Sequence, residues 1–393
     1  MINKIKLKLF GLLSYILSFV LKDENKLWII GAGNGYTYTD NSRYFYEWIN
    51  KNKNKDKKVF WVTKNPSIFK MLKKNKELNI IYFYSFKGII LLAKAKVYIC
   101  SHGIDDITPY VNKSKVVICL WHGLPIKKIG NMAMGVFGKS NRLNSIISGL
   151  INSKKNYDLF LTPSQYYKNI FEESFGAQIN NYLLAQYPRV TELKEKYKKS
   201  AEDNRIGTIL FAPTFRDFVN QDYYESMGIL PPLDYLNELN VLLSKSNYRL
   251  IIKLHPYINI RRDYINGVDG FNNITFADKN EDVLNLLIYA NVLITDYSSI
   301  YFDFMALNKE IFFLMPDYDI YKNNVRGFNF DFEKIAPGKI YSSWYDIANH
   351  LQYRNIKFEP DDKYAYFLEM SNGYEMRTNQ YIYNEIEKQS LMK

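Results

Sequence analysis

The chain has 393 residues but only two cysteines, Cys100 and Cys119, and four histidines. No CxxC spacing occurs and the histidines are scattered, which argues against a disulfide framework and against the common zinc sites. Each cysteine lies in an apolar run. We therefore expect two buried free thiols in a reducing compartment.

A dinucleotide-binding fingerprint is also missing. The loop Gly31-Ala-Gly-Asn-Gly35 reads GxGxG rather than GxGxxG, and no clear acidic partner follows the second expected strand. We interpret this loop as a turn that touches substrate, not as the site of a dinucleotide cofactor.

The apolar run near the N terminus is too short to cross a membrane, because a spanning helix needs about 20 apolar residues. Residues 1–22 nevertheless have a helical pattern. One side of the helical wheel carries Lys4, Lys8, Gly11, Ser14, Ser18 and Lys22, and apolar residues cover most of the rest. We predict an amphipathic helix lying in the plane of a membrane surface, with a helix packed on the protein or on a partner as the alternative.

Acidic residues are fewer than basic ones, 40 against 52, so the formal net charge is +12. Such a charge suits an anionic partner: a nucleotide, a phosphate polymer, a nucleic acid or a lipid headgroup. Nucleic acid is not expected, because the basic run at residues 51–58 is interleaved with asparagine rather than with aromatic residues. Hydrophobic residues make up 47% of the chain, which excludes a disordered protein.

The length predicts two domains of roughly 150–200 residues each. Apolar runs typical of buried strands alternate with helical patterns, which indicates parallel sheets covered by helices on both faces. The pattern pauses over residues 194–205. We therefore expect two α/β domains, 23–195 and 205–393, with an interdomain cleft. The expected strands are 27–30, 59–62, 80–83, 97–100, 116–121, 158–161, 208–211, 250–254, 274–276, 292–295 and 311–314.

Polar residues follow the expected strand 292–295 and open a helical pattern. Ser298 and Ser299 fall where that helix begins, and a helix start presents free N–H groups and partial positive charge to a phosphate. Asp303 lies one turn further and suits the hydroxyl of a sugar or polyol. The alternative is a serine N-cap followed by an exposed aspartate.

Two histidines also follow expected strands. His122, in the segment Trp121-His122-Gly123-Leu124-Pro125, is a candidate general base, with a structural histidine as the alternative. Lys253 and His255 share one face of extended chain, where a cation and an imidazole suit a diphosphate and its departing oxygen.

Three arginines complete the candidate site. Thr214 and Arg216 follow Pro213 and offer hydrogen-bond donors for phosphate. Arg189 follows Tyr187-Pro188 and lies shortly before the expected domain boundary. Structural ion pairing is an equal contender for Arg189 and Arg216. Arg326, in Val325-Arg326-Gly327, is expected to close the site.

Taken together and in their order along the chain, these motifs resemble those of the CDP-glycerol glycerophosphotransferase family, the teichoic acid primases and polymerases. The segments that carry the resemblance are Trp121-His122-Gly123-x-Pro125-x-Lys127-x-x-Gly130, Tyr187-Pro188-Arg189, Pro213-Thr214-x-Arg216, Lys253-Leu254-His255-Pro256, Thr295-Asp296-Tyr297-Ser298-Ser299-x-x-x-Asp303 and Arg326-Gly327.

The resemblance implies a GT-B fold, in which an N-terminal Rossmann-like domain handles the acceptor and a C-terminal one holds the CDP donor. It implies that His122 is the base and that His255 stabilises the diphosphate. The donor contacts it implies are Trp121, Gly123, Leu124, Pro125, Arg189, Pro213, Thr214, Lys253, Leu254, Ser298, Ser299 and Asp303. It also implies peripheral attachment to the cytoplasmic face of the cell membrane.

The predicted function is transfer of a polyol phosphate, first of all glycerol phosphate, from a CDP-polyol to a lipid-linked or polymer acceptor. No metal and no cofactor are expected. The alternatives are a CDP-ribitol-using transferase, a GT-B glycosyltransferase with a nucleotide sugar, and a basic membrane-bound scaffold that is not an enzyme. The length of the chain favours a primase or a short capsule-type transferase. A homo-oligomer is left open.

Overall fold

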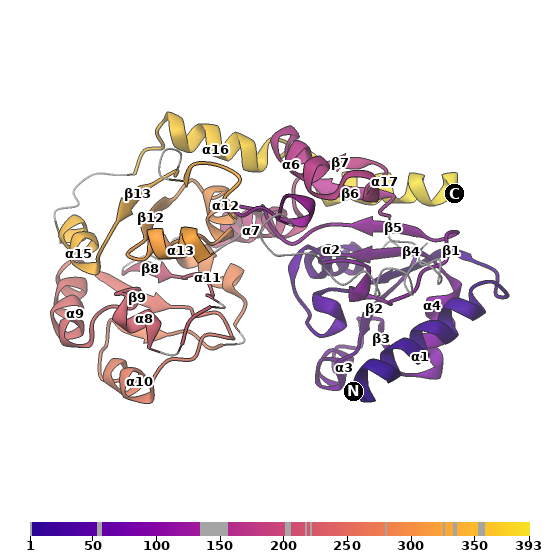
Figure 1. Cartoon of the computed structure of the whole chain (residues 1–393), viewed down its shortest axis with the longest axis horizontal. Coiled ribbons are helices and arrows are strands. Elements are labelled where there is room, and N and C mark those ends of the chain that lie inside the picture. The colour runs from indigo at the N-terminus through magenta and orange to yellow at the C-terminus, as the bar shows by residue number, and fades with distance from the viewer. Residues whose placement is uncertain are drawn as a thin grey trace. The chain divides into compact units, whose positions relative to one another are not determined.

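The computed structural model divides into two compact units, which we describe separately (Figure 1). Unit 1 comprises Met1–His122, Gly130–Glu192 and Asn372–Lys393, and unit 2 comprises Gly123–Ile129 and Leu193–Ser371. The structure describes residues 2–52, 57–133, 156–200, 206–216, 218–220, 222–279, 281–324, 327–332, 336–352 and 358–393.

Within the described residues, unit 1 contains a seven-stranded parallel sheet of order β3-β2-β1-β4-β5-β6-β7. The strands are β1 (Glu24–Ile30), β2 (Lys58–Thr63), β3 (Ile80–Tyr82), β4 (Ala95–Cys100), β5 (Val116–Cys119), β6 (Leu159–Thr162) and β7 (Tyr182–Leu184). The helices are α1 (Ile2–Leu17), α2 (Asp40–Lys51), α3 (Pro66–Lys73), α4 (Phe86–Lys94), α6 (Gln165–Phe175), α7 (Pro188–Lys199, which continues into unit 2) and α17 (Asn379–Met392). The central strands β4 and β5 are buried along their whole length, as a parallel sheet covered on both faces requires.

Unit 2 contains a six-stranded parallel sheet of order β10-β9-β8-β11-β12-β13 in the part that the structure describes. Its strands are β8 (Gly207–Phe211), β9 (Tyr248–Ile252), β10 (Ile274–Phe276), β11 (Val292–Thr295), β12 (Glu310–Leu314) and β13 (Lys339–Tyr341). Its helices are α8 (Tyr223–Ser226), α9 (Leu236–Lys245), α10 (Arg262–Val268), α11 (Val283–Tyr289), α12 (Ile300–Met305), α13 (Tyr318–Asn324), α15 (Trp344–Gln352) and α16 (Asp362–Asn372).

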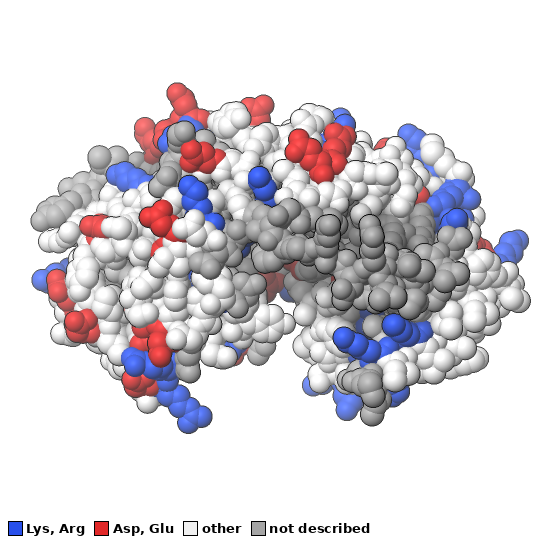
Figure 2. All heavy atoms as spheres, viewed as in Figure 1, with Lys and Arg blue, Asp and Glu red and all other residues white. Residues whose placement is uncertain are grey.

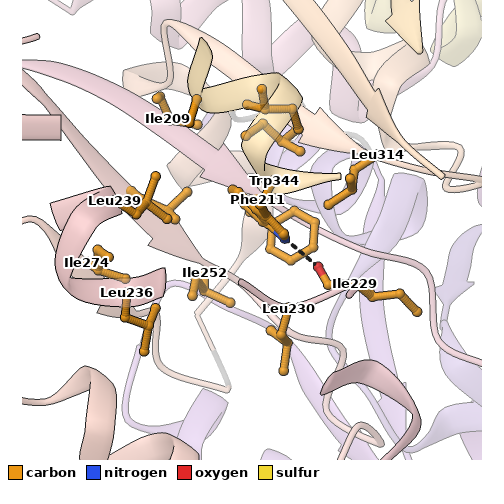
Figure 3. Close-up of a cluster of buried hydrophobic side chains, with 14 of the residues drawn as sticks. Ile209, Phe211, Ile229, Leu230, Leu236, Leu239, Ile252, Ile274, Leu314 and Trp344 are labelled. Atoms are coloured by element: carbon orange, nitrogen blue, oxygen red, sulfur yellow. Dashed lines mark hydrogen bonds between the residues drawn. The ribbon is translucent and has the colours of Figure 1, made fainter. Parts of the chain in front are cut away.

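The core of unit 2 lies between this sheet and the helices α9 and α15. Phe211, Ile252 and Leu239 meet there, and the indole of Trp344 packs among them (Figure 3). The indole N–H donates to the carbonyl of Ile229 at 2.9 Å, so a large apolar group is buried without an orphaned polar atom.

These observations confirm the predicted α/β class with two parallel sheets. They also confirm that Cys100 and Cys119 are buried free thiols. Two features were not predicted. The last helix, α17, belongs to unit 1, where the ring of Tyr383 lies 5.1 Å from that of Trp28. The segment Gly123–Ile129 belongs to unit 2, although the chain on either side of it belongs to unit 1.

Helix α1 packs on α4. The helical wheel alone did not determine which side of α1 faces the rest of the unit. Its small residues Gly11, Ser14 and Ser18 are buried. A Cβ on Gly11 would lie 2.6 Å from the ring of Pro109, so this close approach requires glycine. The amide of Asn112 donates to Ser18 Oγ at 3.1 Å.

The apolar side of α1 faces away from the unit. Ile5 is 61% exposed and Ile16 is 52% exposed, and just beyond the helix Val20 is 78% exposed. Lys4, Lys6, Lys8 and Lys22 are also exposed. Figure 2 shows lysine and arginine side chains (blue) on this part of unit 1. Among the described helices, none has both the length and the apolar character needed to cross a bilayer.

Candidate active site

The polar residues of unit 1 gather where three neighbouring strands end. β1, β4 and β5 are parallel neighbours, and Cys100 pairs with Cys119 in the register of β4 and β5. The segments that follow these strands therefore come side by side: the loop Gly31–Gly35, then Ser101 and His102, then Trp121 and His122. Such a strand edge is the usual ligand site of an open α/β sheet.

The first three residues of α2 hold this edge together. Asp40 pairs with His102, with Oδ2 at 3.3 Å from Nε2. Asn41 donates to the carbonyl oxygens of Leu120 and Trp121 at 3.1 and 2.9 Å. The hydroxyl of Ser42 accepts from that of Ser101 at 2.7 Å. Sequence reasoning missed all three, because no motif marks them.

His122 has the geometry of a neutral base. Its Nδ1 lies 3.2 Å from the carbonyl oxygen of Ser101, and since a carbonyl only accepts, the ring proton is on Nδ1. Nε2 is then left with its lone pair. Burial, followed by the neighbouring His102, lowers the pKa of His122 to about 4, so the ring is neutral at physiological pH.

His102 is a second imidazole at this edge, and sequence reasoning did not select it. Its ring stacks on that of His122, with centroids 4.3 Å apart and planes 11° from parallel. Its Nδ1 accepts from the backbone N–H of Gly33 at 3.1 Å. The only signal in the sequence was its position directly after a strand, which it shares with His122.

The Gly31–Gly35 loop uses its N–H groups within the protein. Gly33 donates to His102, and Asn34 donates to Asp106 Oδ1 at 2.7 Å. Gly33 and Gly35 have φ values of 55° and 83°, which explains the glycines. The loop therefore supports the histidine cluster. Its predicted contact with substrate stays a prediction.

Arg189 joins the same cluster. Its Nη1 donates to the carbonyl oxygen of His122 and lies 3.6 Å from Asp40 Oδ1, and its backbone N–H donates to Asn41 Oδ1 at 3.2 Å. The side chain is buried. These contacts agree with structural ion pairing, the second of the two interpretations of this arginine.

The motif that begins at Trp121 is divided between the units. Trp121 is buried among Phe160, Phe171 and Phe175 in unit 1. Gly123, Leu124 and Pro125 belong to unit 2, where the side-chain amide of Asn329 donates to the carbonyl oxygens of Pro125 and Lys127 at 2.9 and 3.0 Å. Leu124 is buried.

In unit 2, Arg216 is a buried hub rather than an open phosphate ligand. Its Nε and Nη2 donate to the two oxygens of Asp317 at 2.7 and 3.0 Å, and Nη2 lies 2.9 Å from Asp296 Oδ2. Nη1 donates to the carbonyl oxygen of Thr214 at 2.7 Å. These contacts favour the ion-pair interpretation, because the fork of the guanidinium is directed at protein oxygens.

Thr214 depends on the same network. Its backbone N–H and its hydroxyl both donate to Asp296 Oδ1, at 2.8 and 2.6 Å. Asp296 in turn follows strand β11, next to β8 in the sheet. Pro213, between β8 and Thr214, is buried, so the loop that carries Thr214 is fixed at both ends.

Lys253 and His255 lie at the end of β9. The Lys253 ammonium donates to the carbonyl oxygens of Asp278 and Lys279 at 2.9 and 2.8 Å, and burial lowers its pKa. His255 is exposed and its ring stacks on Phe215, 5.3 Å between centroids. Its Nδ1 accepts from the N–H of Tyr257 at 3.3 Å. Leu254, between them, is buried.

The segment after β11 differs from the simple N-cap alternative. Ser299 occupies the N-cap position of α12 without a side-chain cap, and α12 has only six residues. Asp303 is 5% exposed, so it is not the exposed aspartate of that alternative. The predicted contacts of Ser298, Ser299 and Asp303 with a donor stay predictions.

Arg326 lies outside the described residues, so its predicted role stays a prediction. Within the described ranges, no three His, Cys, Asp or Glu side chains are grouped as a metal ion would need.

The sequence matches the model of the CDP-Glycerol:Poly(glycerophosphate) glycerophosphotransferase family over residues 13–388. The chain therefore belongs to this family, which confirms the resemblance seen in the motifs.

Curated relatives agree with the family. A teichoic acid poly(glycerol phosphate) polymerase of Bacillus spizizenii is 28% identical over 381 residues, which cover 90% of this chain and 93% of that protein. A teichoic acid glycerol-phosphate primase of Bacillus subtilis is 30% identical over 292 residues, which cover 71% of this chain and 72% of that protein.

A solved structure of the wall teichoic acid polymerase TagF is similar to the whole chain. Its TM-score is 0.75 at 22% identity, and the match covers 100% of this chain and 96% of that one. A solved structure of a putative UDP-N-acetylglucosamine 2-epimerase from Listeria monocytogenes is also similar, with a TM-score of 0.51 at 10% identity. This match covers 94% of this chain and 98% of that one. These likenesses confirm the predicted GT-B fold.

Proposed function

We propose that this chain transfers a polyol phosphate, first of all glycerol phosphate, from a CDP-activated donor to a hydroxyl of a lipid-linked or polymer acceptor. CMP is released, and the product belongs to a teichoic acid or a capsule-type polymer. The observation that carries the proposal is the family match over residues 13–388. The relatives named as glycerol-phosphate polymerase and primase support the same donor.

The chemistry assigned to His122 follows from its tautomer. With its proton on Nδ1, the ring takes the proton of the acceptor hydroxyl at Nε2. The acceptor oxygen attacks the β-phosphorus of the donor, the bond from that phosphorus to the bridging oxygen breaks, and CMP leaves. A new phosphodiester remains.

In this mechanism, the charge that develops on the phosphates is borne by residues of unit 2. The candidates for stabilising this charge are the exposed His255, Lys253 and the backbone at Ser298 and Ser299. Arg216 acts through Thr214 and Asp296 rather than by direct contact. Phosphoryl transfer depends mainly on positioning and charge neutralisation, so this set suits the reaction.

We further propose that no bound metal or cofactor takes part. The segment Thr295–Asp303 carries two carboxylates that could be considered as Mg²⁺ ligands, Asp296 and Asp303. In the structure, Asp296 Oδ1 accepts from the N–H and the hydroxyl of Thr214, and Oδ2 forms an ion pair with Arg216 Nη2 at 2.9 Å. A metal ion at Asp296 would have to displace these contacts.

A donor screen tests the proposal. The purified chain is incubated with CDP-glycerol, CDP-ribitol and UDP-sugars, each with and without EDTA, and release of CMP or UDP is measured. Release of CMP from CDP-glycerol in the presence of EDTA is expected. Turnover of a UDP-sugar alone would contradict the assignment, and a loss in EDTA that Mg²⁺ restores would contradict only the metal-free mechanism.

Ribitol phosphate is the second candidate for the transferred group. A teichoic acid ribitol-phosphate primase of Bacillus spizizenii is 29% identical over 240 residues, which cover 58% of this chain and 58% of that protein. The same screen distinguishes the two polyols by their relative rates of CMP release.

We propose that α1 attaches the chain to an anionic membrane surface on the cytoplasmic side. The helix turns its small residues inward and its apolar residues outward; exposed lysines lie in its N-terminal half, and Lys22 is exposed beyond its C-terminal end. Apolar side chains entering the bilayer boundary, together with lysines at the headgroups, are the two contributions that hold an interfacial helix.

A further inference from the structure

The proposed mechanism uses one imidazole of unit 1 and leaves His102 without a role. Yet the ring of His102 stacks directly on the ring of His122. The two rings are nearly parallel, 11° apart, with centroids separated by 4.3 Å. A stacked neighbour at that distance restricts tilting of the His122 ring out of its plane.

His102 is itself held from three elements. The loop after β1 donates to its Nδ1 through the N–H of Gly33 at 3.1 Å. The start of α2 supplies Asp40, whose Oδ2 lies 3.3 Å from Nε2. The backbone N–H of His102 donates to Asp106 Oδ2 at 2.8 Å. Because Gly33 donates to Nδ1, the neutral ring carries its proton on Nε2, which lies 3.3 Å from Asp40 Oδ2.

Asp40 adopts an unusual backbone conformation to reach this position. Its φ is +60°, in the left-handed region that non-glycine residues rarely occupy. Strain of this kind persists where the surrounding structure over-determines it and is concentrated at functional sites. The second carboxylate oxygen of Asp40 lies 3.6 Å from Arg189 Nη1, and the same Nη1 donates to the carbonyl oxygen of His122.

We propose that His102, held by Asp40, is a positioning residue for the transfer reaction. Its ring is the platform that fixes the plane of His122 and presents the Nε2 lone pair to the acceptor hydroxyl. This inference rests on the proposed function of His122 as the base.

The charged groups around the two rings agree with this arrangement. Asp40 from α2, Asp106 from the turn after β4 and Arg189 from α7 face the pair. Burial opposes the charged form of His102, but Asp106 and Asp40 outweigh it and raise the pKa of His102. Any positive charge on His102 in turn favours the neutral form of His122.

Three variants separate positioning from mere folding. His102→Phe keeps a planar stacked ring but removes the link to Asp40. Asp40→Asn keeps both histidines and weakens the link. Asp105→Asn is the matched control, since Asp105 is an exposed carboxylate next to Asp106 whose side chain has no hydrogen bond or ion pair with either described ring. We expect kcat for CMP release to fall about 10- to 100-fold in the first two variants, with the KM for CDP-glycerol unchanged, because a misplaced base slows chemistry without weakening donor binding.

A second readout does not need the donor. The chain has only four histidines, so ¹⁵N-histidine labelling with single substitutions assigns each ring by NMR. In the wild-type chain, His122 is expected to show a protonated Nδ1 and an unprotonated Nε2 at neutral pH. In His102→Phe, the pKa of His122 is expected to rise and this tautomer signature to weaken, whereas Asp105→Asn leaves both unchanged.

The inference is overturned if His102→Phe and Asp40→Asn turn over like the wild type, or if they leave the His122 titration and tautomer unaltered. Failure of the proposed function gives a different result. In that case the wild-type chain releases no CMP, while the NMR measurement still decides whether His102 positions His122.

Discussion

Asn41 donates from Nδ2 to the carbonyl oxygen of Trp121 at 2.9 Å, and Trp121 has a φ of +55°. A bulky residue is strained in this left-handed region. Asn41 is fully buried and also binds the carbonyl oxygen of Leu120 and the N–H of Arg189. One side chain of α2 therefore stabilises the backbone conformation that places His122 at the strand edge.

Substituting Asn41 tests this relationship. In Asn41→Ala, two buried carbonyl oxygens and one N–H lose their partner. We expect the free energy of unfolding to fall by about 1–3 kcal/mol, the usual cost of leaving such groups unsatisfied. Urea unfolding measures the change, and kcat for CMP release should fall with it. Unchanged stability and unchanged kcat would show that the strand edge holds its conformation without Asn41.

The Arg216 hub makes a second prediction, for the stability of unit 2. Arg216→Met leaves Asp317 and Asp296 buried without their cation, and breaking a buried pair in this way costs about 3–5 kcal/mol. Arg261→Met is the control, because Arg261 is an exposed arginine that also pairs with a carboxylate, Glu225. Thermal unfolding should show a large loss for the first variant and little for the second. Equal effects would mean that Arg216 is not the hub.

The fold was largely predictable from the sequence because most strands are strongly apolar. Runs such as 97–100 and 292–295 are buried on both faces and read as strands without any context. The strands that sequence reasoning missed are β7 and β13. Each has three residues and forms one edge of its sheet, as do β3 and β10, which were predicted; β7 has one buried residue and β13 has none.

The site was less predictable than the fold. His122 and His255 were found because each directly follows an expected strand, 116–121 and 250–254. Asp40, Asn41 and His102 were missed because their importance arises from contacts between segments 60 to 80 positions apart, which no local spacing reveals. Arg216 was placed at the correct strand end. The sequence alone did not show that the carboxylate of Asp317, 101 positions later, would pair with its guanidinium.

A third prediction concerns α1. The triple variant Ile5→Ser, Leu9→Ser and Ile16→Ser removes apolar area from its outward side and leaves the buried glycine and serines intact. We expect weaker flotation with anionic phosphatidylglycerol vesicles and unchanged turnover of a soluble acceptor.

The control for α1 removes exposed apolar side chains elsewhere. Met376→Ser, Leu391→Ser and Met392→Ser alter residues that are 93%, 71% and 69% exposed. This control should float like the wild type. If both triple variants float equally well, α1 is not the membrane contact.

A fourth prediction follows from the protonation of His122. Its pKa is lowered in the folded chain to about 4 from an ordinary value of 6.5. Between these values the unfolded chain binds a proton that the folded chain does not, so the free energy of unfolding rises with pH over this window and is unaffected above it.

Urea unfolding from pH 4 to 7.5 measures that effect in the wild-type chain and in His122→Gln. The stability difference between the two should change between pH 4 and 6.5 and be constant above. A difference that is flat throughout would mean that His122 is not protected from protonation by the fold.

The most direct test of the account is a double-mutant cycle on CMP release from CDP-glycerol. His122→Ala and His255→Ala are each expected to lower turnover by at least about 100-fold. If both imidazoles act in one transfer step, the double variant is about as slow as the slower single variant. Losses that multiply in the double variant, or a single variant that releases CMP at the wild-type rate, would contradict the mechanism.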